Sequence, residues 1–363
     1  MRAPGALQRL ARRVALILTI ATGSPAGCTA STLPELEIDV AAITVSGLSS
    51  GGFMAVQIHV ARSSLFSGAG VVAGGPYACA LGSIWPALVT ATTICMDIEG
   101  DFIPFAGPPS VDASVRATRD AWAMDAIDDP GNMRDDRVYL FSGARDNTVP
   151  TSVMDAVEDY YLEFVDADGI SYQNSIDAGH GFATMEEGVA CSMTASPYLN
   201  DCNYDTAGEI LDHLYGGSLS APRNRYREDG LIEFDQAPFT PPGFSPRDVS
   251  LADQGFIYVP EDCADGARCA LHVALHGCRQ HAGAVGRAFV EGAGFNAWAE
   301  ANDIVVLYPQ ARAVDAIRPD RTNPRGCWDW WGYTGNGFHL RAAPQISTIA
   351  AMVESLAGSG EQR

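Results

Sequence analysis

Residues 45–54 read VSGLSSGGFM, a glycine-rich stretch that holds two adjacent serines. It follows an apolar run, EIDVAAITV, that is typical of a β-strand, and residues 53–61 repeat apolar side chains at helical spacing. Two adjacent serines, Ser49 and Ser50, lie between the strand and the helix with three glycines close around them. A sharp, glycine-rich turn of this kind predicts that a serine at its centre projects from the edge of a β-sheet.

Only Ser49 stands at the centre of a G-x-S-x-G frame, which runs from Gly47 to Gly51. In such a turn the central hydroxyl is a candidate nucleophile for a carbonyl carbon. The backbone N–H of the next residue, Ser50, would then stabilise the oxyanion that forms. The alternative interpretation is a glycine-rich connection without a catalytic role.

A serine nucleophile needs a base, and the base needs an orienting acid. Asp146, in SGARDNTVP, follows an expected strand, and His180, in DAGHGF, follows the next one. The order serine, acid, histidine is typical of α/β-hydrolases. We therefore expect Asp146 and His180 to complete a triad. Asp146 could instead be a turn or capping residue; Asp177 is the alternative acid and His339 the reserve base.

Strand-like and helix-like segments alternate along most of the chain. This alternation predicts an α/β fold with a mainly parallel sheet that helices cover on both faces. We expect residues 216–249, which are rich in Gly, Ser, Pro and Arg, to form a long irregular connection. The expected strands are 66–75, 137–143, 170–176, 255–260, 269–277 and 304–310, and the expected helices are 53–61, 152–165, 286–302 and 346–357.

A second oxyanion donor usually comes from a histidine–glycine loop that precedes the serine along the chain. Nothing upstream of Ser49 supplies such a loop, but ALHGCRQ at 274–280 has this form. We infer a circular permutation, in which the closing helix at 345–357 packs near the strand that leads into Ser49. The backbone N–H of Cys278 is then the second expected oxyanion donor.

Residues 326–333 read GCWDWWGY and contain three of the six tryptophans of the chain. Aromatic side chains offer a flat apolar area with a polar group at one end. We expect this segment to form a wall of a substrate cleft, and ordinary core packing around a disulfide is the alternative. The candidate binding residues are Trp328, Trp330, Trp331 and Tyr333.

The chain has nine cysteines, and eight remain when Cys28 is set aside. An even number in an exported protein favours disulfides. A metal site is not expected, because no Cys-x-x-Cys pair occurs and no cysteine has a suitably spaced histidine. The sequence does not establish the pairing, but nearest neighbours suggest Cys79–Cys95, Cys191–Cys202, Cys263–Cys269 and Cys278–Cys327.

Residues 1–30 are typical of a secretory signal, with Arg2, Arg9, Arg12 and Arg13 before the apolar run 14–21 and small residues after it. This run is too short to cross a bilayer, so no integral membrane span is expected. Lipid anchoring through Cys28 is a weaker alternative. The net charge of −21 argues against nucleic acid and anionic membranes as partners.

The motifs GLSSGGFMAVQ, GARDNTVP, AGHGF, LHGCRQ and GCWDWWGY together resemble the extracellular poly(3-hydroxybutyrate) depolymerases of the circularly permuted type. The resemblance covers residues from about 40 to about 356. It implies a nucleophile at Ser49, an acid at Asp146, a base at His180, and cleavage of polyester through an acyl-enzyme. The sequence departs from many of these relatives in one respect, because we expect a single catalytic domain at 31–363 and no separate polymer-binding domain.

We therefore expect a secreted, monomeric serine esterase that acts on polyhydroxybutyrate or its oligomers without a metal or cofactor. Amorphous polymer and soluble oligomers are more plausible substrates than crystalline polymer, because no separate binding module is expected. One alternative is a carbohydrate esterase, such as a feruloyl or acetyl-xylan esterase, with the same triad. The other is a non-catalytic protein that binds a polymer or a glycan.

Overall fold

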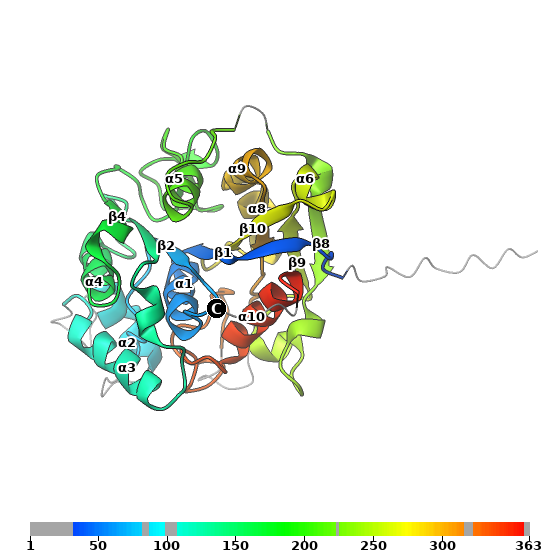
Figure 1. The fold of residues 1–363 in the computed structure, drawn as a ribbon. Helices are drawn as coiled ribbons and strands as arrows, with labels where there is room; N and C mark the ends of the chain where they lie inside the picture. Colours follow the sequence, from blue (N-terminus) through cyan, green and yellow to red (C-terminus); the bar gives the residue numbers. More distant parts are fainter. Residues whose placement is uncertain (1–31, 82–86, 99–106, 223–224, 316–321, 359–363) are drawn as a thin grey trace, which may run out of the picture. The chain divides into compact units, whose positions relative to one another are not determined.

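An eight-stranded sheet is built around β1 (Glu37–Leu48), which lies near its centre (Figure 1). The computed structural model describes residues 32–81, 87–98, 107–222, 225–315 and 322–358. Across the sheet the strand order is β4-β3-β2-β1-β10-β11-β9-β8. The other strands are β2 (Gly68–Val72), β3 (Arg137–Phe141), β4 (Ile170–Gln173), β8 (Leu231–Asp235), β9 (Gln254–Tyr258), β10 (Arg268–Leu275) and β11 (Ile304–Tyr308).

The six strands from β4 to β11 in this order are parallel, whereas β9 and β8 pair antiparallel at one edge. The predicted α/β fold with a mainly parallel sheet is therefore confirmed. The expectation that residues 216–249 are wholly irregular is wrong, because β8 lies within them. β8 lies at the edge of the sheet, where Leu231 and Phe234 are buried and Glu233 is exposed.

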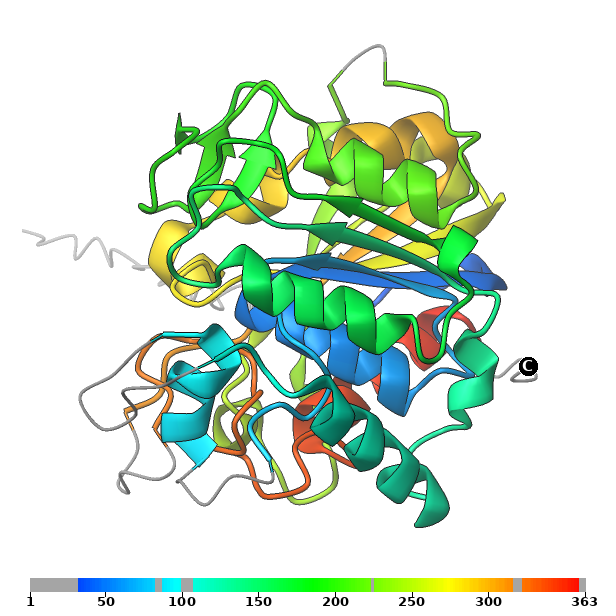
Figure 2. The ribbon, with the colours of Figure 1, turned by 90° about the vertical axis from the view of Figure 1, so that its left-hand side faces the viewer.

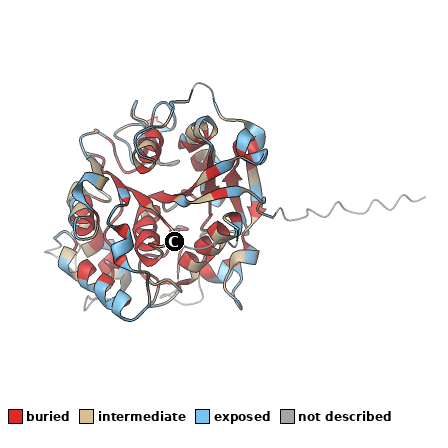
Figure 3. Cartoon of the chain, in the orientation of Figure 1, coloured by how far each residue is buried: buried red, intermediate tan, exposed pale blue. Residues whose placement is uncertain are grey.

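Helices cover both faces of the sheet (Figure 2): α5 and α9 lie on one face, and α1, α4 and α10 lie on the other. Every residue of α1 is buried, because this helix lies between the sheet and neighbouring segments (Figure 3). The helices are α1 (Ser50–Ala61), α2 (Ala87–Thr92), α3 (Val111–Ala123), α4 (Thr151–Tyr161), α5 (Thr206–Leu214), α6 (Glu261–Ala264), α7 (Ala282–Val285), α8 (Ala288–Gly292), α9 (Phe295–Asn302) and α10 (Pro344–Leu356).

The helix expected at 286–302 is divided into α8 and α9. The break falls at Gly294, whose φ of 98° lies in the left-handed region, where residues other than glycine are disfavoured. Short 3-10 turns occur at Ile94–Met96, Pro130–Met133, Ala167–Gly169, Glu228–Gly230, Ala237–Phe239 and Pro246–Val249.

The spatial order of the strands differs from their chain order in the way that the predicted permutation requires. β1 pairs with β10 on one side and with β2 on the other. If α10 were joined to β1, the chain would cross the sheet from β8 to β4 with a single exchange, of β10 and β11. The C-terminal half of the chain thus supplies the strands that would come first in an unpermuted chain.

A small sheet of β5 (Phe182–Thr184), β7 (Leu199–Asp201) and β6 (Val189–Ala190) follows β4, in that spatial order. Four disulfides join loops and strands, and they connect the same pairs that the sequence suggests. These disulfides are Cys79–Cys95, Cys191–Cys202, Cys263–Cys269 and Cys278–Cys327.

Residues from 31 onward group into one compact unit. The expected signal segment at 1–30, including Cys28, lies outside the described residues. In the part of the chain that is described, no helix has the length and apolar character needed to cross a membrane.

The pairing of β1 with β10 buries His272 between Thr44 and Ser46. The two imidazole nitrogens are hydrogen-bonded to the Thr44 and Ser46 hydroxyls, at 2.7 Å each. The side chain is fully buried, and this desolvation lowers the pKa of His272 to about 3. The folded protein therefore holds this imidazole neutral at moderately acidic pH.

This buried imidazole should make the protein less stable in mild acid. An unfolded histidine binds a proton near pH 6.5, whereas folded His272 does not until about pH 3. The free energy of unfolding should therefore fall as the pH falls below 6.5, by up to about 1.4 kcal/mol per pH unit for this one group. Urea unfolding from pH 7.5 to pH 4.5 measures the slope, which should be smaller in His272→Gln. Equal slopes in the two proteins would contradict the assignment.

Candidate active site

The candidate nucleophile Ser49 lies at the junction of β1 and α1, in a strained backbone conformation. Its φ is 56° and its ψ is −121°, which is unusual for a residue other than glycine. The Ser49 N–H donates to the carbonyl of Val72 at 2.8 Å, and the Ser49 carbonyl accepts from Phe53 N–H at 2.9 Å. The turn is thus held from β2 and from α1, as a nucleophile elbow requires.

The two outer glycines of the G-x-S-x-G frame are required by close approach of the backbone. A Cβ atom at Gly47 would lie 2.2 Å from the carbonyl oxygen of Gly51. A Cβ atom at Gly51 would lie 2.4 Å from the carbonyl oxygen of Leu275, at the end of β10. The elbow therefore packs against itself and against the strand that carries the histidine–glycine loop.

The structure brings Asp146 and His180 together at the same end of the sheet. Asp146 follows β3, and its Oδ2 accepts from His180 Nδ1 at 2.7 Å. Its Oδ1 accepts from the backbone N–H groups of Thr148 and Val149 at 2.8 and 2.9 Å. Because Nδ1 of His180 donates to this buried carboxylate, Nε2 is left as the nitrogen that can accept a proton.

The alternative acid and base lie in other surroundings. Asp177 pairs with Arg145 at 3.0 Å, and its side chain is 72% exposed. His339 packs edge-on against Tyr77, and burial lowers the pKa of His339 to about 4. Neither Asp177 nor His339 lines the pocket that contains Ser49 and His180. The structure thus brings Ser49, Asp146 and His180 to one site. Asp177 and His339 lie away from this site.

Two backbone N–H groups are available for an oxyanion, those of Ser50 and Cys278. Ser50 is the first residue of α1, where backbone N–H groups have no partner within the helix. Among the described residues, neither N–H donates to a protein acceptor. The N-terminus of α1 adds a partial positive charge at the same place, which favours an anion.

The loop after β10 that carries Cys278 is held by the side chains of His276 and Gln280. His276 Nδ1 donates to the carbonyl of Gly277 at 2.7 Å, and its Nε2 accepts from Ala311 N–H at 3.1 Å. Burial lowers the pKa of His276 to about 3, so the imidazole stays neutral. Gln280 accepts from Gly277 N–H at 2.8 Å through its side-chain oxygen. The motif LHGCRQ contains these residues, but it does not reveal their contacts.

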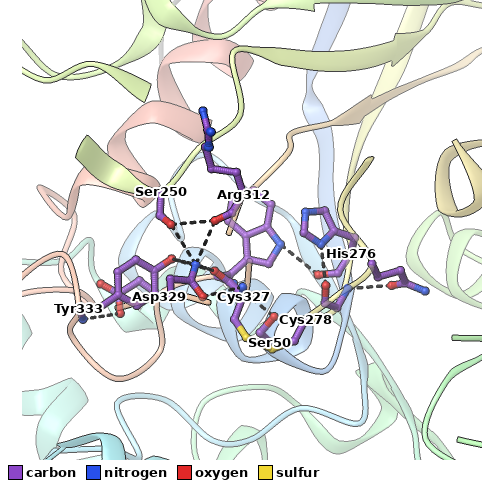
Figure 4. The surroundings of a disulfide bond; sticks show 12 residues. Ser50, Ser250, His276, Cys278, Arg312, Cys327, Asp329 and Tyr333 are labelled. Atoms are coloured by element: carbon purple, nitrogen blue, oxygen red, sulfur yellow. Dashed lines mark hydrogen bonds between the residues drawn. A yellow bond between two sulfur atoms is a disulfide. The ribbon is translucent and has the colours of Figure 1, made fainter. Parts of the chain in front are cut away.

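The disulfide Cys278–Cys327 joins this loop to the aromatic segment (Figure 4). On the other side of the bond, the Ser50 hydroxyl accepts from Trp328 N–H at 3.2 Å. Asn323 Nδ2 donates to the Cys327 carbonyl at 2.7 Å, and this hydrogen bond also holds the aromatic segment in place. The two adjacent serines therefore have different surroundings, since Ser49 lines the pocket and the Ser50 hydroxyl supports its wall.

A pocket of about 510 Å³ contains Ser49 and His180. Its apolar wall includes Leu88, Phe53 and Trp330, and the rings of Phe53 and Trp330 stack with their centroids 4.0 Å apart. Thr194 also lines the pocket, and its hydroxyl accepts from His180 N–H at 2.9 Å. An apolar pocket of this size beside a serine suits an ester substrate of a few units.

The aromatic segment 326–333 divides between the pocket and the core. Trp330 and Trp331 line the pocket, as expected, with their rings perpendicular to each other. Trp328 and Tyr333, the other two candidate binding residues, do not line the pocket and lie in the core instead. Trp328 is fully buried and donates through Nε1 to the His276 carbonyl at 3.0 Å. Tyr333 is buried and donates to the Cys327 carbonyl at 2.8 Å.

An α/β sheet with a serine elbow after a central strand, and with an acid–histidine pair after the next strands, defines the class of α/β-hydrolases. No protein-family model matches the chain. Over 335 residues, which are 90% of this chain and 62% of the relative's length, it is 44% identical to a poly(3-hydroxybutyrate) depolymerase of Delftia acidovorans. It is 35% identical to a polyhydroxybutyrate depolymerase of Talaromyces funiculosus, over 90% of this chain and 93% of that protein.

Two solved structures of PHB depolymerases also match this chain. The crystal structure of the PHB depolymerase from Penicillium funiculosum matches 91% of this chain and all of that chain, with a TM-score of 0.79 and 31% identity. A serine-to-alanine variant of a PHB depolymerase, complexed with an R3HB trimer, matches equally well, with a TM-score of 0.79 and 32% identity. The chain belongs to the polyhydroxybutyrate depolymerases, a family of ester-hydrolysing enzymes, as the sequence motifs predicted.

Proposed function

We propose that the protein is a secreted serine esterase that hydrolyses poly(3-hydroxybutyrate) or its oligomers. The observation that carries this proposal is the 2.7 Å hydrogen bond between Asp146 and His180, in a protein whose relatives are polyhydroxybutyrate depolymerases. Ser49 and His180 line one pocket, so an ester bound there can meet the nucleophile and the base together. Trp330 and Trp331 supply apolar walls for the polyester.

The proposed reaction begins when the Ser49 hydroxyl attacks the ester carbonyl carbon and His180 Nε2 takes its proton. The Asp146 carboxylate stabilises the imidazolium that forms, and the N–H groups of Ser50 and Cys278 hold the oxyanion. The carbon–oxygen bond to the alcohol part then breaks, and His180 protonates the leaving alkoxide. Water repeats the sequence on the acyl-enzyme and releases the hydroxy acid.

Secretion is proposed from the four disulfides, which persist in oxidising compartments, together with the expected signal at 1–30. In this proposal residues 31–363 act as one catalytic domain, and the protein works as a monomer. The substrate is a polyester or an oligomer of it, and the reaction uses no metal or cofactor.

The test compares two kinds of ester under the same conditions. The purified protein should clear a suspension of amorphous poly(3-hydroxybutyrate) and release hydroxybutyrate, whereas Ser49→Ala serves as the blank. Feruloylated and acetylated xylan are offered in parallel. Clearing without release from xylan supports the proposal. Release of ferulate or acetate without clearing would replace it with the carbohydrate esterase, and binding of the polymer without hydrolysis of any ester would replace it with the non-catalytic protein.

A further inference from the structure

The active-site pocket carries two arginines in a protein that is strongly acidic. The chain has 44 Asp and Glu residues against 23 basic ones. Among the described residues that line the pocket, Arg279 and Arg325 are present and no Asp or Glu is found. The local charge of the pocket wall is therefore opposite to the net charge of the protein.

These two arginines have no ion-pair partner among the described residues, unlike three exposed arginines elsewhere on the protein. Arg119, Arg134 and Arg145 each form an ion pair with a nearby carboxylate. For Arg279 and Arg325, no ion pair or side-chain hydrogen bond to another described residue is found. Both residues are exposed, so both guanidinium groups are available to an anion from solution.

The backbone holds the two arginines together beside the oxyanion loop. The Arg279 N–H donates to the Arg325 carbonyl at 2.7 Å. Two residues beyond Arg325, Cys327 is bonded to Cys278, which precedes Arg279 directly. Arg279 therefore directly follows Cys278, an expected oxyanion donor. The hydrogen bond and the disulfide hold Arg325 beside the same loop. Ser49, Arg279 and Arg325 line the same pocket, so one short substrate can contact all three.

An oligomer of 3-hydroxybutyrate offers an anion at one end only. Its hydroxyl end belongs to the acyl part that Ser49 would take up, and its free carboxylate belongs to the alcohol part that leaves. Guanidinium groups bind carboxylates through charge-assisted hydrogen bonds that match the carboxylate geometry. We propose that Arg279 and Arg325 bind the free carboxylate of the leaving part of a short oligoester. This inference rests on the proposed function and names its substrate class.

The consequence is a preference for ester bonds close to the carboxylate end of an oligomer. The reaction is ordinary ester hydrolysis. The bond between the carbonyl carbon and the alkoxy oxygen breaks, and the alkoxide takes the proton from His180. The carboxylate stays ionised throughout and serves only for recognition. The product that leaves first is a short hydroxy acid that carries this carboxylate.

The experiment compares the 3-hydroxybutyrate trimer as a free acid with its methyl ester, in which the terminal charge is absent. The quantity measured is the ratio of kcat/KM for the acid to kcat/KM for the methyl ester, per active site titrated with an organophosphate. In the double variant with Arg279→Gln and Arg325→Gln, this ratio should fall by about tenfold, mainly through KM for the acid. Added NaCl should lower the wild-type ratio and leave the ratio of the double variant unchanged.

Arg119→Gln is the matched control, because Arg119 is exposed, is paired with Glu163 and does not line the pocket. Its ratio should equal that of the wild type. Arg279→Lys with Arg325→Lys keeps both charges and should restore part of the ratio. An unchanged ratio in the double glutamine variant would overturn the inference and leave the proposed function intact. If the wild type hydrolyses neither trimer, the proposed function itself fails.

Discussion

Replacement of Ser49 by alanine is expected to lower kcat on hydroxybutyrate oligomers by about 10⁵-fold to 10⁶-fold, as for other serine nucleophiles that act in a triad. The strained elbow places this residue in the pocket with His180, whereas the hydroxyl of the adjacent Ser50 accepts from Trp328 N–H. Product release is measured by chromatography over days for the variant. Mass spectrometry of the quenched enzyme should find a mass increase of one acyl unit on wild type only.

Ser50→Ala provides the comparison, because Ser50 is the adjacent serine on the same turn. The variant keeps the backbone N–H that is proposed to hold the oxyanion and loses only the hydroxyl that accepts from Trp328 N–H. Its loss in kcat should be smaller than that of Ser49→Ala by several orders of magnitude. An acyl group on the Ser49→Ala protein, with none on Ser50→Ala, would reverse the assignment of the two serines.

Asp146→Asn is expected to lower kcat by about 10⁴-fold while leaving the fold intact. Asparagine has the same shape, but its amide favours the imidazole tautomer in which Nε2 carries the proton, and that nitrogen can no longer serve as the base. The backbone donors Thr148 and Val149 lie beside this side chain and would hold an amide oxygen in place. Measured kcat should fall, and urea unfolding should show a folded variant.

Asp177→Asn is the control for this change, since Asp177 is the alternative acid that the sequence suggests. Its carboxylate pairs with the exposed Arg145 and takes no part in the pocket. Activity of this variant should match that of the wild type within experimental error. A large loss in Asp177→Asn, with little loss in Asp146→Asn, would move the acid to Asp177.

The sequence signals of the candidate reacting groups are local. The glycines around Ser49 are needed by backbone contacts that lie within the turn or directly across from it. Asp146 and His180 each follow a strand, and parallel strands bring the loops at their carboxyl ends to one edge. The motif around Cys278 similarly indicates a loop after a strand, and only its unusual place in the chain required the inference of a permutation.

The features that were not predicted depend on distant parts of the chain. In GCWDWWGY the sequence does not show which rings face the pocket, and that choice is made by contacts such as Trp328 with the His276 carbonyl. β8 was missed because its five residues lie among glycines and prolines, and it forms by pairing with β9. The lack of ion-pair partners for Arg279 and Arg325 is likewise a property of the folded surface, and it cannot be predicted from the sequence.

The permuted strand order also determines when the catalytic machinery can exist during synthesis. Thr44 on β1 and His272 on β10 are neighbours in the sheet, yet 228 positions separate them along the chain. At ribosomal speed this separation corresponds to about 10–45 s between the elbow and the oxyanion loop. During that time β1 has an open edge, and Ser49 lacks the loop that contains Cys278. A nascent chain that ends before β10 therefore lacks the proposed oxyanion donor of Cys278, and we expect it to hydrolyse no ester until the C-terminal half docks onto β1.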